Sequence, residues 1–120
     1  MSEHILIVED DPDTLRLLKR WLESLGYEAD TTMNGATALT LLQESIYGGM
    51  ILDIYIPGMY GLEVLKHVPE FHPRLPVVMI TGHPECQAEA MRLGAQAFLL
   101  KPFTTKEFKA AVEHSIGPVM

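Results

Sequence analysis

The chain has 120 residues, which is the usual length of one domain, and its 48% apolar and 21% charged residues are typical of a globular protein rather than a disordered or fibrous one. Its 16 acidic residues against 9 lysines and arginines give a net charge of −7, and such a chain repels phosphate backbones, so we expect no direct binding of nucleic acid. The single cysteine, Cys86, excludes an internal disulfide.

Short apolar runs alternate with helical patterns along the chain. Strands are expected at residues 5–8, 27–32, 50–52, 77–80 and 97–100. Helices are expected after Asp11 and Pro12, from Asn34 and Gly35, and around residues 62–68 with an end near Pro69 and Pro73. Two more are expected from Pro84 to Leu93 and after Thr104, which has capping-box spacing to Glu107.

Strands that are apolar throughout and separated by helices predict an α/β fold with a parallel sheet covered on both faces. Right-handed crossovers make such a sheet doubly wound. The start of the chain lacks the basic and apolar pattern of a secretion signal, and no apolar run is long enough to span a membrane. We therefore expect a cytoplasmic domain with no membrane partner.

Polar residues follow four of the five expected strands. Glu9 and Asp10 follow the first strand, Asp53 the third, Thr81 the fourth and Lys101 the fifth. In doubly wound sheets the site lies beyond the carboxyl ends of the strands, so these groups are expected to meet.

Three carboxylates placed together repel one another, and one lysine cannot neutralise them. Oxygen-only ligands favour Mg²⁺, which would keep open positions for phosphate oxygens. Asp53, on the central strand, is the best candidate for a covalent nucleophile toward a phosphoryl group, with Thr81 and Lys101 compensating its charge.

In this order these segments resemble the response-regulator receiver domains of two-component signalling, over essentially the whole chain. The resemblance is carried by residues 5–12, by Leu52-Asp53 with residues 57–59 and Gly61 after it, by residues 80–82, by Gly94-Ala95 and by residues 98–103. It implies a flavodoxin-like sheet of five parallel strands in the order 2-1-3-4-5, and a single receiver domain over residues 1–120.

The resemblance also assigns roles to site residues. Asp53 matches the phosphoacceptor, Glu9 and Asp10 match the acidic pair that holds Mg²⁺ with Asp53, and the backbone carbonyl of Tyr55 would be a further metal ligand. Thr81 and Lys101 match the pair that contacts the phosphoryl group. Thr81 and Phe98 match the switch pair, and the bond from Lys101 to Pro102 would be cis.

The resemblance implies a phosphorylation switch rather than an enzyme that turns over an external substrate. A sensor histidine kinase or a histidine phosphotransfer protein would be the donor. The fourth helix, fifth strand and fifth helix would form the surface that contacts a partner, an output domain or a second copy. The sequence departs from the common family pattern at Tyr60, where many members have an acid, and at Gly48-Gly49, where Pro-Asp is common.

Three alternatives to the switch remain. A phosphohydrolase with an aspartate nucleophile would need a second acid two residues after Asp53, where this chain has Tyr55. A nucleotide-binding or flavin-binding module would need a glycine-rich first loop, where this chain is acidic. A degenerate receiver usually loses a site residue, and here all five are present.

Tyr55 and His83 each follow a site residue by two, so we expect their side chains to set how fast water reaches a phosphorylated Asp53.

Overall fold

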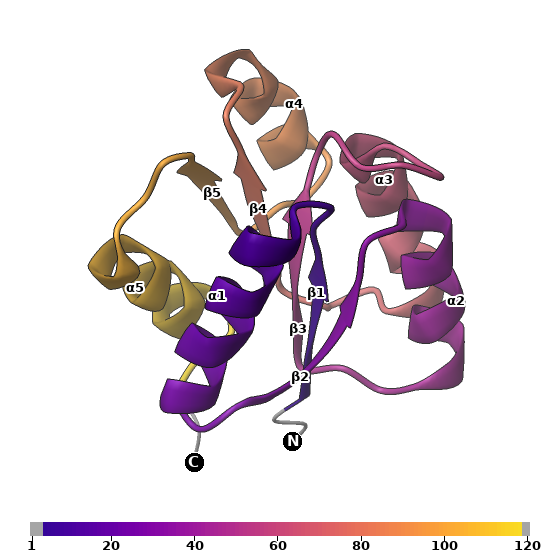
Figure 1. The fold of residues 1–120 in the computed structure, drawn as a ribbon. Helices are drawn as coiled ribbons and strands as arrows, with labels where there is room; N and C mark the ends of the chain where they lie inside the picture. Colours follow the sequence, from indigo (N-terminus) through magenta and orange to yellow (C-terminus); the bar gives the residue numbers. More distant parts are fainter. Residues whose placement is uncertain (1–3, 119–120) are drawn as a thin grey trace.

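The computed structural model describes residues 4–118 as a five-stranded parallel sheet with helices on both faces (Figure 1). The strands are β1 (His4–Val8), β2 (Glu28–Thr32), β3 (Gly49–Asp53), β4 (Val77–Thr81) and β5 (Ala97–Leu100). The helices are α1 (Pro12–Ser24), α2 (Gly35–Glu44), α3 (Gly61–Phe71), α4 (Gln87–Arg92) and α5 (Thr105–Ser115), with a 3₁₀ turn, η1 (Pro84–Cys86), before α4. The strand order β2-β1-β3-β4-β5 confirms the predicted topology.

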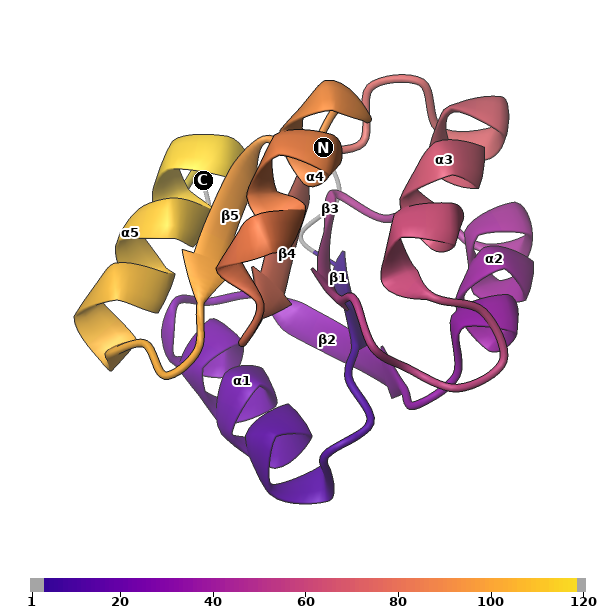
Figure 2. The same ribbon diagram turned by 90° about the horizontal axis from the view of Figure 1, so that it is seen from above.

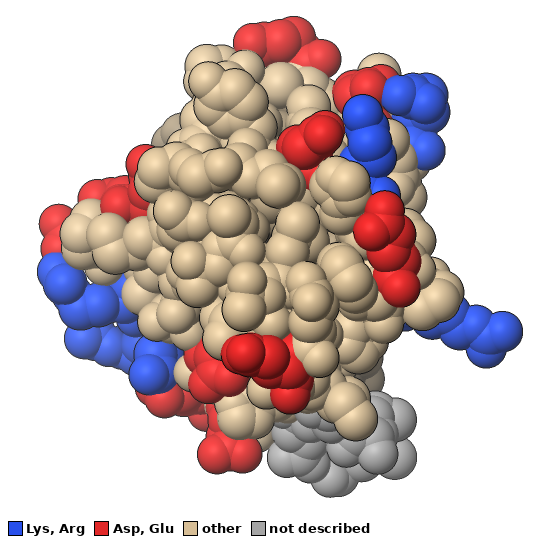
Figure 3. Space-filling view, turned by 90° about the vertical axis from the view of Figure 1, so that its right-hand side faces the viewer, with Lys and Arg blue, Asp and Glu red and all other residues tan. Residues whose placement is uncertain are grey.

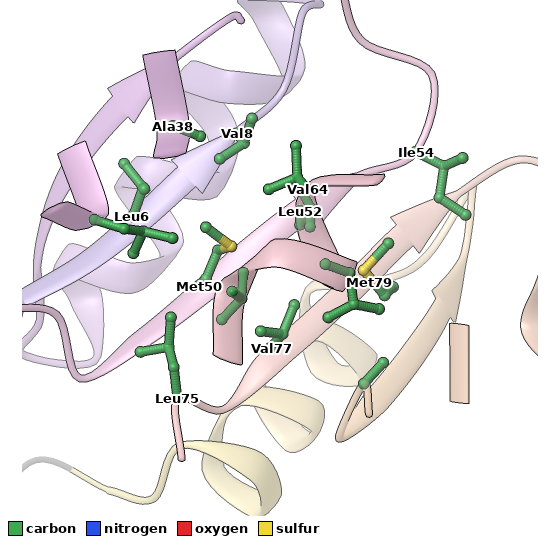
Figure 4. Close-up of a cluster of buried hydrophobic side chains, with 14 of the residues drawn as sticks. Leu6, Val8, Ala38, Met50, Leu52, Ile54, Val64, Leu75, Val77 and Met79 are labelled. Atoms are coloured by element: carbon green, nitrogen blue, oxygen red, sulfur yellow. The ribbon is translucent and has the colours of Figure 1, made fainter. Parts of the chain in front are cut away.

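Alternate residues of each strand point to opposite faces of the sheet and build two apolar layers. Leu6, Met50 and Met79 belong to the layer under α2, α3 and α4 (Figure 4). Ile5 and Ile51 belong to the layer under α1 and α5, and Figure 2 shows these two helices on one side of the sheet. Each fully buried large aliphatic side chain stabilises the fold by about 1.5–3 kcal/mol, so both faces hold the sheet in place.

Helices α1, α2 and α5 begin where the sequence predicts. The Asp11 carboxylate accepts a hydrogen bond from the Thr14 backbone N–H at 3.1 Å and caps α1. Asn34 caps α2 in the same way, and Thr104 forms the predicted capping box with Glu107 at the start of α5. These caps satisfy backbone N–H groups that have no partner within the helix.

One predicted helix boundary is confirmed and another is wrong. Helix α3 ends at Phe71, between Pro69 and Pro73 as expected; Pro69 lies in the last turn, and the His72 N–H still bonds to the Val68 carbonyl at 2.8 Å. The segment from Pro84 starts as a 3₁₀ turn, so α4 itself begins only at Gln87. No helix within residues 4–118 has the length and apolar character needed to cross a membrane.

A polar network joins β1, β2 and the loop after α2 at the amino-terminal end of the sheet. The Tyr47 hydroxyl donates to Asp30 Oδ2 at 2.8 Å, and His4 Nε2 lies 3.1 Å from Asp30 Oδ1. The Tyr47 hydrogen bond, and after it His4, lowers the pKa of Asp30. Burial, and after it the bond to Asp30, raises the pKa of Tyr47 to about 12.

We expect Tyr47→Phe to lower the free energy of unfolding by about 1 kcal/mol at neutral pH, because Asp30 is partly exposed and loses one charged hydrogen bond. The folded pKa of Asp30 lies below its ordinary value of 3.8. The difference in free energy of unfolding between wild type and Tyr47→Phe is therefore complete above that value and disappears as the pH falls through the folded pKa. Urea titrations at several pH values check this. A difference that is constant down to strong acid would contradict it.

Candidate phosphoryl and metal site

The carboxyl ends of four strands bring the predicted polar residues to one edge of the sheet, at the top of Figure 1. Glu9 and Asp10 follow β1, Asp53 ends β3 and Thr81 ends β4. Lys101 follows β5, and its backbone N–H bonds to the Thr81 carbonyl at 2.7 Å. This edge is the place that the doubly wound topology predicts for a site.

The Lys101 ammonium joins two of the carboxylates. Lys101 Nζ lies 2.6 Å from Glu9 Oε1 and 2.9 Å from Asp53 Oδ2. These contacts connect residues that are 92 and 48 positions apart in the sequence. The predicted convergence of an acid pair, the central aspartate and the lysine is therefore confirmed.

Backbone N–H groups hold the second oxygen of each of these carboxylates. Ile54 N–H donates to Asp53 Oδ1 at 2.7 Å, and Asp11 N–H donates to Glu9 Oε2 at 3.0 Å. Glu9 is fully buried and Asp53 is 6% exposed, and a buried polar group costs free energy unless its atoms are hydrogen-bonded, so these partners stabilise both side chains inside the fold. Asp10, by contrast, is exposed to solvent.

The pKa shifts reflect this crowding of charge. Burial alone would lower the pKa of Lys101, but the hydrogen bonds to Glu9 and Asp53 outweigh it and the pKa is raised. The pKa of Asp10 is also raised, first by partial burial and then by the adjacent Glu9 carboxylate. The site therefore has an excess of negative charge that favours a further cation.

Glu9, Asp10 and Asp53 each offer a carboxylate oxygen, and these oxygens lie within 4.8 Å of one another. Among residues 4–118 no other group of His, Cys, Asp or Glu side chains meets this condition. Oxygen ligands with no nitrogen or sulfur suit Mg²⁺. The Tyr55 carbonyl, two residues after Asp53, stays a predicted ligand.

Thr81 and Phe98, the predicted switch pair, lie on the neighbouring strands β4 and β5. The register pairs Asp53 with Ile80, so Thr81 is one residue further along the same edge. Thr81 is fully buried, and its Oγ accepts a hydrogen bond from the His83 N–H at 3.3 Å. Phe98 is half-buried against the apolar layer on the α4 side. Their movement on phosphorylation stays a prediction.

Aromatic side chains gather in the loops that follow β3 and β4. The rings of Tyr55 and His83 lie 4.4 Å apart, and the ring of Tyr60 lies 6.0 Å from that of Tyr55. The Tyr55 hydroxyl is 3.9 Å from Cys86 Sγ, and His83 Nδ1 is 3.3 Å from Glu85. Tyr55 and His83, which lie two residues after Asp53 and Thr81, therefore contact each other.

Two glycines that position the site were not singled out for this role by sequence reasoning. A Cβ on Gly61 would lie 2.1 Å from the Asp53 carbonyl oxygen, and one on Gly35 would lie 2.1 Å from the Met59 carbonyl oxygen. Gly61 N–H also donates to the Ile54 carbonyl at 2.6 Å. Both are close backbone approaches that depend on tertiary packing, so the local sequence carries no signal for them beyond the glycine itself.

The family model for the response regulator receiver domain matches residues 5–113. The chain belongs to this family. Among curated proteins, the DNA-binding transcriptional regulator NtrC of Escherichia coli is 38% identical over 120 residues, which cover 98% of this chain and 26% of NtrC. This receiver domain thus spans about a quarter of the length of that relative.

Solved structures agree with this assignment. A receiver domain protein described as CheY-like from Methanospirillum hungatei matches with a TM-score of 0.90 and 26% identity, covering 97% of this chain and 94% of that one. The response regulator protein TrrA of Thermotoga maritima, in complex with Mg(2+)-BeF, matches with a TM-score of 0.85 and 32% identity, covering 94% and 97% of the two chains. The fold and the family are those that the sequence motifs predict.

Proposed function

We propose that Asp53 of this receiver domain accepts a phosphoryl group from a phosphohistidine donor. The observation that carries the proposal is the Lys101 ammonium, which bridges Asp53 and Glu9 at the strand ends beside Asp10. The site has a buried carboxylate on the central strand, a lysine ammonium in contact with it, and two further acids beside it. This arrangement suits phosphoryl transfer, which depends on positioning and charge compensation.

In the proposed step, one Asp53 carboxylate oxygen bonds to phosphorus while the bond from phosphorus to the donor imidazole nitrogen breaks. The imidazole leaves with the bonding electron pair, and Asp53 becomes an acyl phosphate. Lys101 and the Thr81 hydroxyl would compensate charge on the phosphoryl oxygens. Attack by water on phosphorus would later release inorganic phosphate and restore the carboxylate, so the chain catalyses its own modification rather than turning over an external substrate.

Asp10 and Asp53 are the residues proposed to hold Mg²⁺ directly, together with the Tyr55 carbonyl. One Glu9 carboxylate oxygen accepts a hydrogen bond from Lys101 and the other accepts one from the Asp11 N–H. We therefore propose that Glu9 contacts the metal through a water molecule. Bound Mg²⁺ would supply positive charge to the phosphoryl oxygens. The Mg(2+)-BeF complex of the relative TrrA supports a magnesium site in this fold.

The output surface is proposed to be α4, β5 and α5. Phosphorylation would turn the Thr81 hydroxyl toward the phosphoryl group and let Phe98 move inward, which shifts a two-state equilibrium of this surface. Met91 and Leu100 are exposed there, as expected of residues that contact a partner, an output domain or a second phosphorylated copy.

A sensor histidine kinase or a histidine phosphotransfer protein is the proposed donor, and the cytoplasm is the proposed compartment. We propose that residues 1–120 form a single receiver domain, although residues 1–3 and 119–120 lie outside the described part. NtrC, a transcriptional regulator, is longer than this chain, which supports control of an output domain by receivers of this kind. We propose no nucleic-acid or membrane contact for the receiver itself.

Incubation with acetyl phosphate and Mg²⁺, followed by intact-mass measurement, tests the function. We expect the wild-type chain to gain the mass of one phosphoryl group and Asp53→Asn to gain none. Asp13→Asn, at an exposed acid on α1, is the matched control and should behave as wild type. An equal adduct on the Asp53 variant, or steady turnover of a phosphomonoester by the wild-type chain, would refute the proposal.

A second measurement concerns the lifetime of the phosphorylated state. We expect a chain with both Tyr55→Ala and His83→Ala to lose its phosphoryl group several-fold faster than wild type, because the two rings, whose centroids lie 4.4 Å apart, no longer limit the approach of water. The decay of the intact-mass adduct after removal of acetyl phosphate gives the rate. Tyr60→Ala, in the more distant ring, is the comparison variant, and an unchanged half-life in the double variant would contradict the expectation.

A further inference from the structure

Glu9 differs from most acids of this chain in having no contact with solvent. Figure 3 shows acidic and basic side chains at the surface of one side of the molecule, where water surrounds them. The Glu9 side chain is 0% exposed, whereas Asp10 next to it is exposed. A buried carboxylate is costly unless it is paired and hydrogen-bonded, so the partners of Glu9 indicate its role.

Both carboxylate oxygens of Glu9 have a partner within the chain. Oε1 accepts a hydrogen bond from the Lys101 ammonium at 2.6 Å, and Oε2 accepts one from the Asp11 N–H at 3.0 Å. The Glu9 N–H donates to the Thr32 carbonyl at 3.1 Å, which ties the residue to β2. Glu9 is therefore an acceptor fixed by backbone contacts, and the side chain that it holds is that of Lys101.

Lys101 is a side chain that needs such a partner. It has a flexible four-carbon stem and is 28% exposed, so without a partner the ammonium is free to turn toward solvent. Its contact with Glu9, at 2.6 Å, is shorter than its contact with Asp53, at 2.9 Å. Hydrogen bonds that involve charged groups are about twice as strong as neutral ones, so Glu9 restricts the ammonium strongly.

The two contacts of Lys101 have different fates in the proposed transfer. When Asp53 becomes an acyl phosphate, its carboxylate charge is lost and the ammonium pairs with phosphoryl oxygens instead. Glu9 takes no part in the bonds that form and break, so its carboxylate is the same before and after transfer. Glu9 is thus the partner of Lys101 that persists through the reaction.

We propose that Glu9 is the positioning residue for Lys101 and holds the ammonium where the phosphoryl oxygens arrive. The proposal rests on the proposed function and divides the work of the acidic pair: Asp10 contacts Mg²⁺ directly, and Glu9 acts on the transfer chiefly through Lys101. A glutamate suits this role because β3 and β4 lie between β1 and β5 in the sheet, so the side chain has to reach across the strand ends.

The first test measures the mobility of the Lys101 side chain in the unphosphorylated chain without metal, by ¹³C NMR relaxation at Cε. We expect Glu9→Gln to lower the order parameter of this group by about half, because the amide is uncharged and offers one acceptor oxygen for two donors. Glu28→Gln, the same change at an exposed position on β2, is the matched control and should behave as wild type. Equal order in Glu9→Gln and wild type would overturn the proposal.

The second test compares rates of phosphorylation by acetyl phosphate at saturating Mg²⁺. Glu9→Gln should slow the wild-type chain at least about tenfold but cause no further loss in Lys101→Met, because a residue that acts through the ammonium has no effect once the ammonium is gone. Asp10→Asn should instead raise the Mg²⁺ concentration needed for half the maximal rate, and should do so in both backgrounds. An equally large loss from Glu9→Gln in both backgrounds would count against the role of Glu9.

Far-UV circular dichroism checks that each variant is folded. If Glu9→Gln does not fold, Glu9→Asp tests the same contact, because it keeps the charge and withdraws the carboxylate from Lys101 by one methylene group. Lys101 should then also lose order, and unchanged order would refute the proposal. A wild-type chain that gains no phosphoryl group would refute the proposed function, and the NMR measurement, made without metal or phosphodonor, would still decide whether Glu9 holds Lys101.

Discussion

Lys101→Met is expected to lower the free energy of unfolding by about 3 kcal/mol at neutral pH in the absence of divalent metal. The substitution removes the ammonium that lies 2.6 Å from Glu9 and 2.9 Å from Asp53 and leaves both carboxylates inside the fold. Removing one partner of a buried ion pair costs more than the pair contributes, because the remaining charge is uncompensated. Urea titration with Lys106→Met as the exposed control measures the effect.

The pH dependence of this loss follows from the pKa of Lys101. Its folded pKa is raised above the ordinary value of 10.5, so its contribution is complete below that value and is lost only as the pH rises through the folded pKa. The stability gap between wild type and Lys101→Met should therefore persist at neutral pH and close in strong alkali. We also expect Mg²⁺ to narrow the gap, because a bound cation takes over part of the charge compensation.

The same variant should gain a phosphoryl group from acetyl phosphate about a hundredfold more slowly, since a fixed donor that compensates the transferred charge has been lost. Equal stability of Lys101→Met and wild type would contradict the proposed charge balance. Equal rates of phosphorylation would contradict the proposed role in transfer. The two readouts thus separate the structural role of Lys101 from its chemical one.

The site could be predicted from the sequence because each of its residues comes directly after an apolar strand. Asp53 and Thr81 end runs of buried residues, and parallel strands place such positions at one edge whatever the intervening helices contain. The fold followed from the same alternation of strands and helices. The helix caps were predictable for a similar reason, since Asp11 and Thr104 act on backbone groups three residues away.

The features that escaped sequence reasoning depend on contacts between distant segments. The contact between the Tyr55 and His83 rings joins the loops after β3 and β4. The bonds of Asp30 to Tyr47 and His4 join three segments at the opposite end of the sheet. Patterns among neighbouring residues do not predict these contacts, because they depend on how distant segments pack together.

Gly61→Ala is expected to lower the free energy of unfolding by about 3 kcal/mol and to abolish the phosphoryl adduct in the molecules that remain folded. The new Cβ would lie 2.1 Å from the Asp53 carbonyl oxygen and 2.7 Å from Ile54 Cα, and backbone atoms cannot move aside as a flexible side chain does. The start of α3 must then separate from the end of β3. That movement displaces Asp53 from the Lys101 ammonium, 2.9 Å away.

Gly82→Ala is the matched control for this variant. Gly82 follows Thr81 at the same edge of the sheet, but a Cβ there has no atom within 4 Å. The same chemical change should therefore leave both the urea midpoint and the adduct as in wild type. If Gly61→Ala were as stable and as readily phosphorylated as Gly82→Ala, the close approach of α3 to Asp53 would not be what holds the reactive carboxylate in position. If stability and the phosphoryl adduct are lost in Gly61→Ala alone, the reactivity of Asp53 depends on the close approach of the start of α3 to the end of β3, which only a residue without a side chain allows.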